Sequence, residues 1–514
     1  MALAQLLCRA QIGLSAPPVG VEVHLGSGLP VFSIVGLPAA AVRESKERVR
    51  AALVNSGFEF PAGRITVNLA PADLPKDGGR FDLAIAIGIL LASGQLPVSP
   101  ETLRGLELYG ELALTGELRT VPGLLLAARH AADVGHRLIV PSDSSAQFAW
   151  VPAAAPLAAA TLLDVCRHLA GERRLSGLRT GEAGMDAGVE ATPNCLTVGT
   201  LDDICGQTEA KRALIVAAAG RHSLLFVGPP GCGKTMLAQR LPALLPELAE
   251  QEAIEVASIA SVSGAAGASG LQGSRGLRRP FRAPHHTASA HAIVGGGARA
   301  RPGEITLAHQ GVLFLDELPE FDRRVLEALR EPLESGIVSV SRANLQAEYP
   351  ARFQLVAAMN PCPCGHLGDS AAACRCSPKS VEQYRARLSG PLLDRLDLRV
   401  ALRSVDEQEI SAHRRAPQAL QRAALERIGA ARECQRRRGR INADLSAAEL
   451  ESIAMPTPAA LQVLAMARRK FGLSLRGTHR CLRVARTLAD LEAVERVDER
   501  HAAEAVSLRR ALAD

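Results

Sequence analysis

Residues 223–235, SLLFVGPPGCGKT, decide the fold of this chain, because they join an apolar run to a glycine-rich loop. The run Leu224–Val227 predicts a buried strand, and the loop fits G-x-x-x-x-G-K-[ST], whose backbone N–H groups and following helix bind phosphate. The residues that we expect to contact the nucleotide are Gly228, Pro229, Pro230, Gly231, Cys232, Gly233, Lys234, Thr235 and Met236. Lys234 should reach the β- and γ-phosphates and Thr235 should bind Mg²⁺. The stretch therefore predicts an α/β domain that binds ATP.

Two further apolar runs predict strands of the same sheet. Residues 311–318, GVLFLDEL, end in acidic residues, and ligands of parallel sheets bind at the carboxyl ends of strands. Asp316 is expected to hold Mg²⁺, and Glu317 to orient and deprotonate the attacking water. The structural alternative is a carboxylate that caps a helix after a core strand. Residues 355–360, LVAAMN, place Asn360 at the end of another strand, where its amide would contact the γ-phosphate or the water.

The composition indicates a globular protein with several domains. The chain has 514 residues, of which 47% are hydrophobic and 22% charged, so two to four domains are expected. A net charge of +6 permits an anionic partner without requiring one. No apolar run approaches the roughly 18 residues of a membrane span, and no basic leader precedes an apolar core. We therefore expect a cytoplasmic protein whose 11 cysteines are thiols or metal ligands rather than disulfides.

Four regions follow from the patterns along the chain. Residues 1–170 predict an α+β domain, with strands at 21–25, 31–35, 64–69 and 107–112 and helices at 40–56, 81–91 and 124–132. Residues 171–199 are polar, glycine-rich and aperiodic, which predicts a linker. Residues 200–402 form the predicted ATPase core, with a helix at 320–334 and a hairpin at 336–353. Residues 403–514 predict a helical region, with helices at 418–438, 461–471 and 478–494.

A cysteine-rich insertion follows Asn360 directly. Residues 360–376, NPCPCGHLGDSAAACRC, carry two C-x-C pairs, Cys362 with Cys364 and Cys374 with Cys376. Two close pairs joined by a short loop can form a tetrahedral thiolate site for Zn²⁺. Free thiols and a redox-active pair remain the alternatives.

A long basic insertion at residues 252–309 interrupts the predicted ATPase core. Such a loop inside a compact domain is usually functional, and a basic, glycine-rich segment suits contact with a phosphate backbone. Its arginines are Arg275, Arg278, Arg279, Arg282, Arg299 and Arg301. A solvated loop between subunits is an equal alternative, and His285, His286 and His291 receive no assignment. In the hairpin, Arg342 and Arg352 are candidate DNA contacts.

The N-terminal region resembles the proteolytic domain of Lon-type proteases. The similarity lies in PADLPKDGGRFDLAIAIGIL and GELALTGELRTVPGLLLAARHA, and that family uses a serine–lysine dyad. Here Arg80 stands where the family has its serine, and residues 123–129 contain no lysine where the family has its second catalytic residue. Lys76 lies in the earlier run and does not replace it. The resemblance therefore implies the fold without the peptidase, with a role in assembly or DNA contact.

Most of the chain resembles the magnesium-chelatase-like AAA+ ATPases, and among them the ComM (YifB) group. The motifs are VGPPGCGKTMLA, FRAPHHTASAHAIVGGG, GVLFLDELPEF, AAMNPCPCGHLGD, SGPLLDRLDL and SLRGTHRCLRVARTLADLE. The resemblance implies a ring, commonly of six subunits and possibly stacked, with Arg395 as arginine finger and Arg476 as the sensor-two residue of a helical lid. A salt bridge from Arg395 to Asp394 or Asp397 is the alternative, and Arg480 and Arg483 are the other sensor candidates.

The same resemblance implies a DNA helicase that drives branch migration on single-stranded or branched DNA during recombination in natural transformation. The residues alone support a Mg²⁺-dependent ATPase with water as the nucleophile. Two other functions therefore stay open: a chelatase-type motor that remodels a protein partner, and a scaffold that is switched by nucleotide binding without productive hydrolysis.

Overall fold

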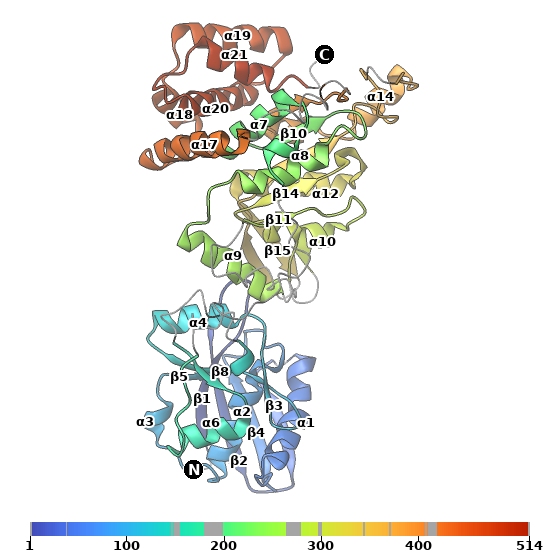
Figure 1. Cartoon of the computed structure of the whole chain (residues 1–514). Helices are drawn as coiled ribbons and strands as arrows, with labels where there is room; N and C mark the ends of the chain where they lie inside the picture. Colours follow the sequence, from blue (N-terminus) through green and yellow to red (C-terminus); the bar gives the residue numbers. More distant parts are fainter. Residues whose placement is uncertain are drawn as a thin grey trace. The chain divides into compact units, whose positions relative to one another are not determined.

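The structure is a computed structural model of the 514-residue chain that describes residues 3–37, 39–144, 148, 155–178, 199–263, 279–296, 301–342, 345–369, 372–406, 409 and 419–511. The chain divides into two compact units (Figure 1). The first unit comprises residues 1–189 and 249–277, and the second comprises 190–248 and 278–514. Most of the predicted linker lies outside the described residues.

A seven-stranded sheet forms the centre of the first unit, in the order β3-β4-β2-β1-β5-β8-β9. Its strands are β1 (Leu3–Arg9), β2 (Pro18–Gly26), β3 (Val31–Val35), β4 (Arg64–Ala70), β5 (Leu106–Leu108), β8 (Arg137–Pro141) and β9 (Leu157–Ala159). Strand β2 is antiparallel to both β1 and β4, whereas β3–β4 and β1–β5–β8–β9 pair in parallel. In β2 and β4 buried side chains alternate with more exposed ones, so one face of these strands packs on the core of the unit.

The helices of the first unit cover this sheet and a short ribbon. They are α1 (Ala40–Asn55), α2 (Asp82–Ala92), α3 (Pro100–Leu103), α4 (Leu124–Asp133), α6 (Leu162–Leu169) and α9 (Glu250–Ser263), and the ribbon pairs β6 (Glu111–Leu112) with β7 (Leu118–Arg119). The apolar helix α2 is buried against β1 and β2, as its composition predicts. The single strand predicted at 107–112 was wrong, because the chain leaves the sheet at Gly110, whose φ is 154°. Helix α9 packs on α4 within this unit.

The second unit contains a five-stranded parallel sheet in the order β11-β14-β17-β10-β18. Its strands are β10 (Leu224–Val227), β11 (Phe281–Arg282), β14 (Val312–Leu315), β17 (Gln354–Met359) and β18 (Leu398–Ala401). Strands β10, β14 and β17 are buried at every residue, which is why they read as continuous apolar runs. Because all the strands are parallel, the segments after β10, β14 and β17 meet at one edge of the sheet.

Short helices and two ribbons surround this sheet. They are α7 (Thr208–Gly220), α8 (Lys234–Arg240), α10 (Ala290–Val294), α11 (Glu304–Leu307), α12 (Arg323–Ala328), α13 (Pro332–Ser335), α14 (Pro378–Arg385) and α15 (Gly390–Arg395), with ribbons β12 (Gly295–Gly296)–β13 (Arg301–Pro302) and β15 (Ile337–Arg342)–β16 (Leu345–Pro350). The β15–β16 ribbon confirms the predicted hairpin. The single helix predicted at 320–334 was wrong: the chain forms α12 and α13 separately, and Pro332, which has no N–H, begins the second.

In the part of residues 403–514 that the structure describes, five helices complete the second unit and confirm the predicted helical region (Figure 1). They are α17 (Leu420–Arg437), α18 (Ala447–Ala454), α19 (Pro458–Phe471), α20 (Leu475–Leu491) and α21 (Glu499–Ser507). Their apolar faces share one continuous core with α7 and the sheet. Asp202 accepts hydrogen bonds from the backbone N–H groups of Leu420 and Gln421, at 2.9 and 3.1 Å, and so caps α17. The mixed α/β class predicted from the sequence is thus confirmed.

Candidate nucleotide site

The predicted phosphate loop lies between β10 and α8, as the motif requires. Gly228 follows the strand, and a Cβ there would lie 2.9 Å from both Cys232 Sγ and Leu402 Cβ, so only glycine fits. Gly231 and Gly233 have φ values of 77° and 90°, in the region that glycine adopts freely. These glycines curl the loop around the N-terminus of α8, where a polyphosphate would meet unpaired N–H groups.

Lys234 is the first residue of α8 and points back into the loop. Its Nζ donates to the carbonyl oxygens of Gly228 and Pro229, each at 2.8 Å, and to Asn360 Oδ1 at 3.1 Å. Burial lowers the pKa of Lys234, while Cys232, Asp316 and Glu317 oppose that shift. The structure therefore brings the predicted phosphate-binding lysine together with the amide at the end of β17.

The two predicted Mg²⁺ ligands are in direct contact. Thr235 Oγ1 donates to Asp316 Oδ2 at 2.7 Å, and the other carboxylate oxygen accepts from the backbone N–H of Glu317 at 2.9 Å. A hydroxyl and a carboxylate that share one face are ligands of the type that Mg²⁺ takes, with substrate phosphates and water completing its shell. The donor set present fits this ion.

Glu317 has a contact that the sequence analysis did not find. Its Oε2 lies 3.1 Å from Nδ1 of His286, and its backbone φ of 51° is left-handed. His286 lies beside His285 with 4.1 Å between ring centroids. The partner of His286 lies 31 positions away in the sequence, whereas His285 contacts the nearby Thr287 Oγ1 at 2.9 Å. The FRAPHHT run, which is more specific than the phosphate loop, was the available signal.

Gln207 is a second residue that the sequence analysis missed. Its Nε2 donates to the carbonyl oxygens of Cys232 at 3.2 Å and Arg403 at 2.7 Å, and the side chain is buried. It ties the start of α7 to the phosphate loop, and its left-handed φ of 51° aims it there. The other predicted loop residues differ in exposure: Pro229 and Cys232 are buried, whereas Pro230 and Met236 are exposed.

The cysteine cluster, Cys362, Cys364, Cys374 and Cys376, comes together in space. The sulfur atoms all lie within 4.8 Å of one another, and the Sγ–Sγ distances are 3.4 Å for Cys362–Cys364, 3.7 Å for Cys362–Cys374 and 3.6 Å for Cys364–Cys374. Four sulfurs at about 2.3 Å from a tetrahedral Zn²⁺ would lie about 3.8 Å apart, so the cluster fits that ion. Backbone N–H groups, that of His366 first, lower the pKa of Cys364 to about 6, which favours the thiolate that binds metal.

The cysteine cluster also contacts the phosphate loop. Gly365, which follows Cys364 in the chain, has a φ of 87°, and a Cβ at this position would lie 2.7 Å from Cδ of Pro230. The segment that carries the four thiols therefore rests on the loop that would hold the phosphates.

The two predicted phosphate-contacting arginines lie at the opposite edge of the sheet. Arg395 precedes β18 and Arg476 lies in the first turn of α20, and both form ion pairs with Glu334. They line a cavity of about 760 Å³ together with Ser223 and Gln354, the residues at the amino ends of β10 and β17. The structure therefore does not bring Arg395 and Arg476 to the phosphate loop of their own chain. The alternative partners Asp394 and Asp397 were wrong for Arg395; Asp397 instead pairs with Arg480 at 2.6 Å.

Two arginines in the described part of the basic insertion have partners within the second unit. Arg282 forms a double hydrogen bond with Glu304, at 2.6 and 2.7 Å, and Arg279 donates to the carbonyl oxygens of Pro246 and Gln310, each at 2.7 Å. The interpretation of these two arginines as free phosphate contacts was wrong, because Arg282 is paired within the insertion and Arg279 is bound to backbone oxygens on either side of it. Arg301 is exposed; Arg275, Arg278, Arg299 and the side chain of Arg342 lie outside the described residues.

In the first unit, Arg80 fills an interior position. Its guanidinium donates to Gln11 Oε1 at 2.7 Å and to the carbonyl oxygen of Pro122 at 2.6 Å, and burial lowers its pKa. Lys76 is also buried, with Nζ donating to the carbonyl oxygen of Pro71, and burial lowers its pKa. Both cations are thus bound to backbone oxygens.

Comparisons with known proteins show which family the chain resembles. The family described as magnesium chelatase, subunit ChlI, matches residues 200–410, with the related N-terminal and C-terminal models at 21–144 and 421–509. Competence protein ComM of Haemophilus influenzae is 48% identical over 99% of this chain and 98% of that protein. Uncharacterized protein YifB of Escherichia coli is 45% identical over 99% and 97%, and the magnesium-chelatase 38 kDa subunit of Cereibacter sphaeroides is 26% identical over 58% and 86%.

Among the described residues, no helix is both long and apolar enough to cross a membrane. The family implies ATPase activity with ATP and Mg²⁺. Since the similarity extends over nearly the full length of both chains, this protein belongs to the ComM/YifB family of magnesium-chelatase-like AAA+ proteins.

Proposed function

We propose that this chain is a ring-forming, cytoplasmic ATPase that drives branch migration of DNA during recombination in natural transformation. The main support for ATP hydrolysis is a group of side chains at the carboxyl ends of the parallel strands. There Lys234 donates a hydrogen bond to Asn360, and Thr235 donates one to Asp316. The DNA part is supported by the similarity to a protein named for competence.

In this proposal, Glu317 accepts the proton of a water whose oxygen bonds to the γ-phosphorus. The bond between that phosphorus and the β–γ bridging oxygen breaks, and ADP leaves. His286, 3.1 Å from Glu317, holds the carboxylate in place before the water arrives. Lys234 and the loop N–H groups bind the phosphates, Asn360 orients the water, and Thr235 with Asp316 would hold Mg²⁺, which neutralises charge on the phosphate oxygens.

Arg395 and Arg476 act on the nucleotide of a neighbouring copy. Their position at the amino edge of the sheet supports this, because the phosphate loop lies at the carboxyl edge. A guanidinium supplied by a neighbour stabilises charge on the transferring phosphoryl group, worth about 10³–10⁵ in rate where it has been measured in GTPases. The proposed assembly is a ring, commonly of six copies, in which each interface completes one site.

The DNA would pass through the ring as a single strand or a branched junction. The ribbon β15–β16, which pairs only with itself among the described strands, is the candidate contact, together with the exposed Arg352. A chelatase-type motor that remodels a protein partner is the second candidate, because the matching family is that of magnesium chelatase.

The cysteine cluster would hold a structural Zn²⁺. Its four sulfurs approach the spacing of a tetrahedral site, and Cys364 is poised as a thiolate. When bound, the ion would fix the loop that contacts Pro230, and so support the shape of the phosphate loop.

The deciding experiment measures ATP hydrolysis without DNA, with single-stranded DNA and with a four-way junction. We expect stimulation by DNA and strand exchange of the junction, both absent in Lys234→Ala. Hydrolysis that persists in Lys234→Ala would refute the nucleotide site. Hydrolysis that no DNA stimulates would instead favour the protein-remodelling motor.

A further inference from the structure

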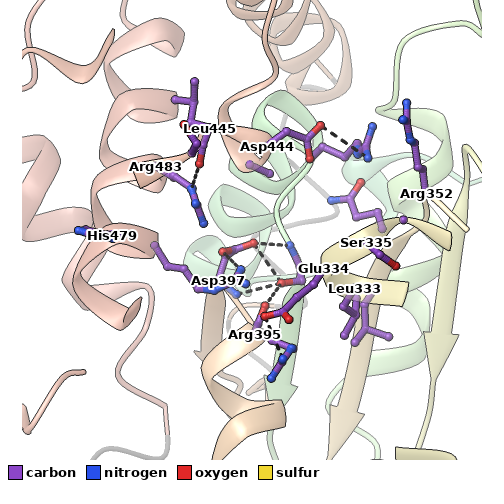
Figure 2. A pocket seen from close by; sticks show the side chains of 18 of the residues that line it. Leu333, Glu334, Ser335, Arg352, Arg395, Asp397, Asp444, Leu445, His479 and Arg483 are labelled. Atoms are coloured by element: carbon purple, nitrogen blue, oxygen red, sulfur yellow. Dashed lines mark hydrogen bonds and ion pairs between the residues drawn. The ribbon is translucent and has the colours of Figure 1, made fainter. Parts of the chain in front are cut away.

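A cavity at the amino edge of the parallel sheet gathers positive charge. Figure 2 shows its lining, which includes Arg352, Arg395 and Arg483. Three of its arginines, Arg476, Arg480 and Arg483, recur every three or four residues on α20 and so share one face of that helix. The cavity faces away from the phosphate loop and is built entirely from the second unit.

Two of these guanidiniums are committed to the interior of the unit. Arg480 donates to the buried carboxylate of Asp397 at 2.6 Å, and Arg483 donates to the carbonyl oxygen of Leu445 at 2.8 Å. One partner is a buried carboxylate and the other a backbone oxygen. The two arginines therefore form the wall of the cavity and are not available to exchange these partners for a ligand.

Arg395 and Arg476 differ from Arg480 and Arg483 because they pair with the same oxygen of one carboxylate. Glu334 Oε1 accepts from Arg395 Nη2 at 2.9 Å and also from Arg476 Nη2. In Figure 2, Glu334 from α13 and Arg395 from α15 point toward one another. Guanidinium groups bind phosphoryl oxygens through the same kind of charge-assisted hydrogen bond that they donate to this carboxylate.

The exposure of the three side chains shows which of them can exchange partners. The Arg395 side chain is 7% exposed, and its Nη1 is fixed on the carbonyl oxygen of Pro391 at 2.8 Å. Within the described part of the chain, its buried Nε has no hydrogen-bond partner. Glu334 and Arg476 are 39% and 50% exposed. Burial disfavours the charged form of Glu334, but the hydrogen bond and charge of Arg395, together with the charges of Arg476 and Arg480, lower the pKa of Glu334.

We propose that Glu334 is a positioning residue for phosphoryl transfer: its carboxylate holds Arg395 and Arg476 side by side, ready for the nucleotide of a neighbouring copy. This inference rests on the proposed function, in which both arginines act across a subunit interface. Without the carboxylate, Arg476 loses its partner and swings into solvent, and Arg395 loses the counter-charge that orients its Nη2. The phosphate loop, at the other edge of the sheet, is unaffected.

The test is steady-state ATP hydrolysis by full-length Glu334→Gln, Glu334→Ala and Glu334→Asp. We expect kcat to fall about tenfold or more in Glu334→Gln and Glu334→Ala with an unchanged KM for ATP, because an interaction made only in the transition state is lost. Glu334→Asp, which keeps the charge, should recover part of kcat. Glu331→Gln, an exposed carboxylate just before α13, is the matched control and should behave as wild type.

A mixing experiment separates this role from a structural one. Glu334→Gln chains keep an intact phosphate loop, and Lys234→Ala chains keep an intact Glu334 with both arginines. Mixed rings should therefore hydrolyse ATP faster than the average of the two separate variants. Thermal melting of each variant identifies any that fails to fold, and Glu334→Asp then provides the decisive comparison.

The failures of the two proposals are distinguishable. If Arg395→Ala is inactive and regains turnover on mixing with Lys234→Ala, the interface site stands. Glu334→Gln and Glu334→Ala with wild-type kcat would then overturn only the positioning role. If Glu334→Gln is slow but mixing restores nothing, while Arg395→Ala is rescued, Glu334 does not act through the arginines. If Arg395→Ala is not rescued either, the interface site itself is wrong, and the positioning role falls with it.

Discussion

Asp397 joins the nucleotide-binding sheet to the helical region, and its replacement by asparagine tests how the second unit is held together. The carboxylate is 4% exposed and accepts from Arg480 at 2.6 Å, from the backbone N–H of Ser223 at 3.0 Å and from its Oγ at 3.1 Å. His222 Nδ1 lies 3.6 Å away. Asp397 therefore contacts the segment before β10 and the middle of α20 at once.

The magnitude follows from removing one member of a buried ion pair. Asparagine keeps the volume but leaves the guanidinium of Arg480, 12% exposed, without a counter-charge. Such a loss costs about 3–5 kcal/mol in the free energy of unfolding. At about 2 °C per kcal/mol for a large domain, the melting temperature of the second unit should fall by about 6–10 °C.

The assay is differential scanning calorimetry of the full chain, in which the transition that rises with added ATP reports the second unit. Asp444→Asn is the matched control. Asp444 pairs with Arg221 at 3.7 Å, but its side chain is 48% exposed, so its loss should cost below about 1 kcal/mol. If Asp397→Asn lowered the melting temperature no more than Asp444→Asn, the proposed tie between sheet and helices would be refuted.

The effect also has a defined pH dependence. Burial disfavours the charged form of Asp397, but Arg480 and then His222 outweigh it and hold the pKa of this carboxyl well below its ordinary value. The pKa in the unfolded chain is near 3.9. The contribution of Asp397 to stability is therefore complete above about pH 5 and is lost as the pH falls toward the folded pKa. The gap between wild type and Asp397→Asn should be constant from pH 8 to 5 and shrink below pH 4.

Three further predictions concern the nucleotide site. Glu317→Gln should retain ATP binding and lower hydrolysis by about 10²–10⁴, measured by nucleotide titration and phosphate release; equal hydrolysis by wild type and variant would favour a nucleotide-switched scaffold. Metal analysis of protein purified without chelators should find about one Zn²⁺ per chain, which the double variant Cys362→Ser, Cys364→Ser loses; no bound metal in wild type would retire the zinc site. Gly365→Ala should weaken ATP binding several-fold in a nucleotide titration, because the new Cβ would lie 2.7 Å from Pro230 Cδ. Gly368→Ala is the control and should bind ATP as wild type does, because Gly368 also has a positive φ but open space around it. Equal effects of the two substitutions would assign the loss to backbone strain alone.

The parts of the site that the sequence predicted are those encoded by contiguous residues. Strand β10, the loop and Lys234 follow one another, and Asp316 and Asn360 each end an apolar run. A parallel sheet brings such strand ends to one edge, so their proximity follows from topology alone. Whether these residues perform the expected chemistry stays a prediction.

The residues that the sequence analysis missed form contacts between distant segments. His286 reaches Glu317 from the basic insertion, and Gln207 reaches Cys232 from the start of α7. Gln207 stands in no recognisable pattern, and the FRAPHHT run that contains His286 does not indicate which residue the histidine contacts. The prediction that Arg282 contacts phosphate failed because its partner is also distant in sequence. The sequence alone does not show that Glu304 pairs with this arginine.

The two edges of the parallel sheet explain why hydrolysis should require assembly. The phosphate loop, Asp316 and Asn360 lie at the carboxyl edge, and Arg395 and Glu334 at the amino edge. Strand β10 has four residues, and at about 3.3 Å per residue it separates the edges by about 13 Å. Because Arg395 is buried and held on Pro391, a change of rotamer cannot carry its guanidinium across the sheet. One chain therefore presents a triphosphate site on one side and an arginine pair on the other, which is the arrangement that a ring of identical subunits, each facing the next, would use at every interface.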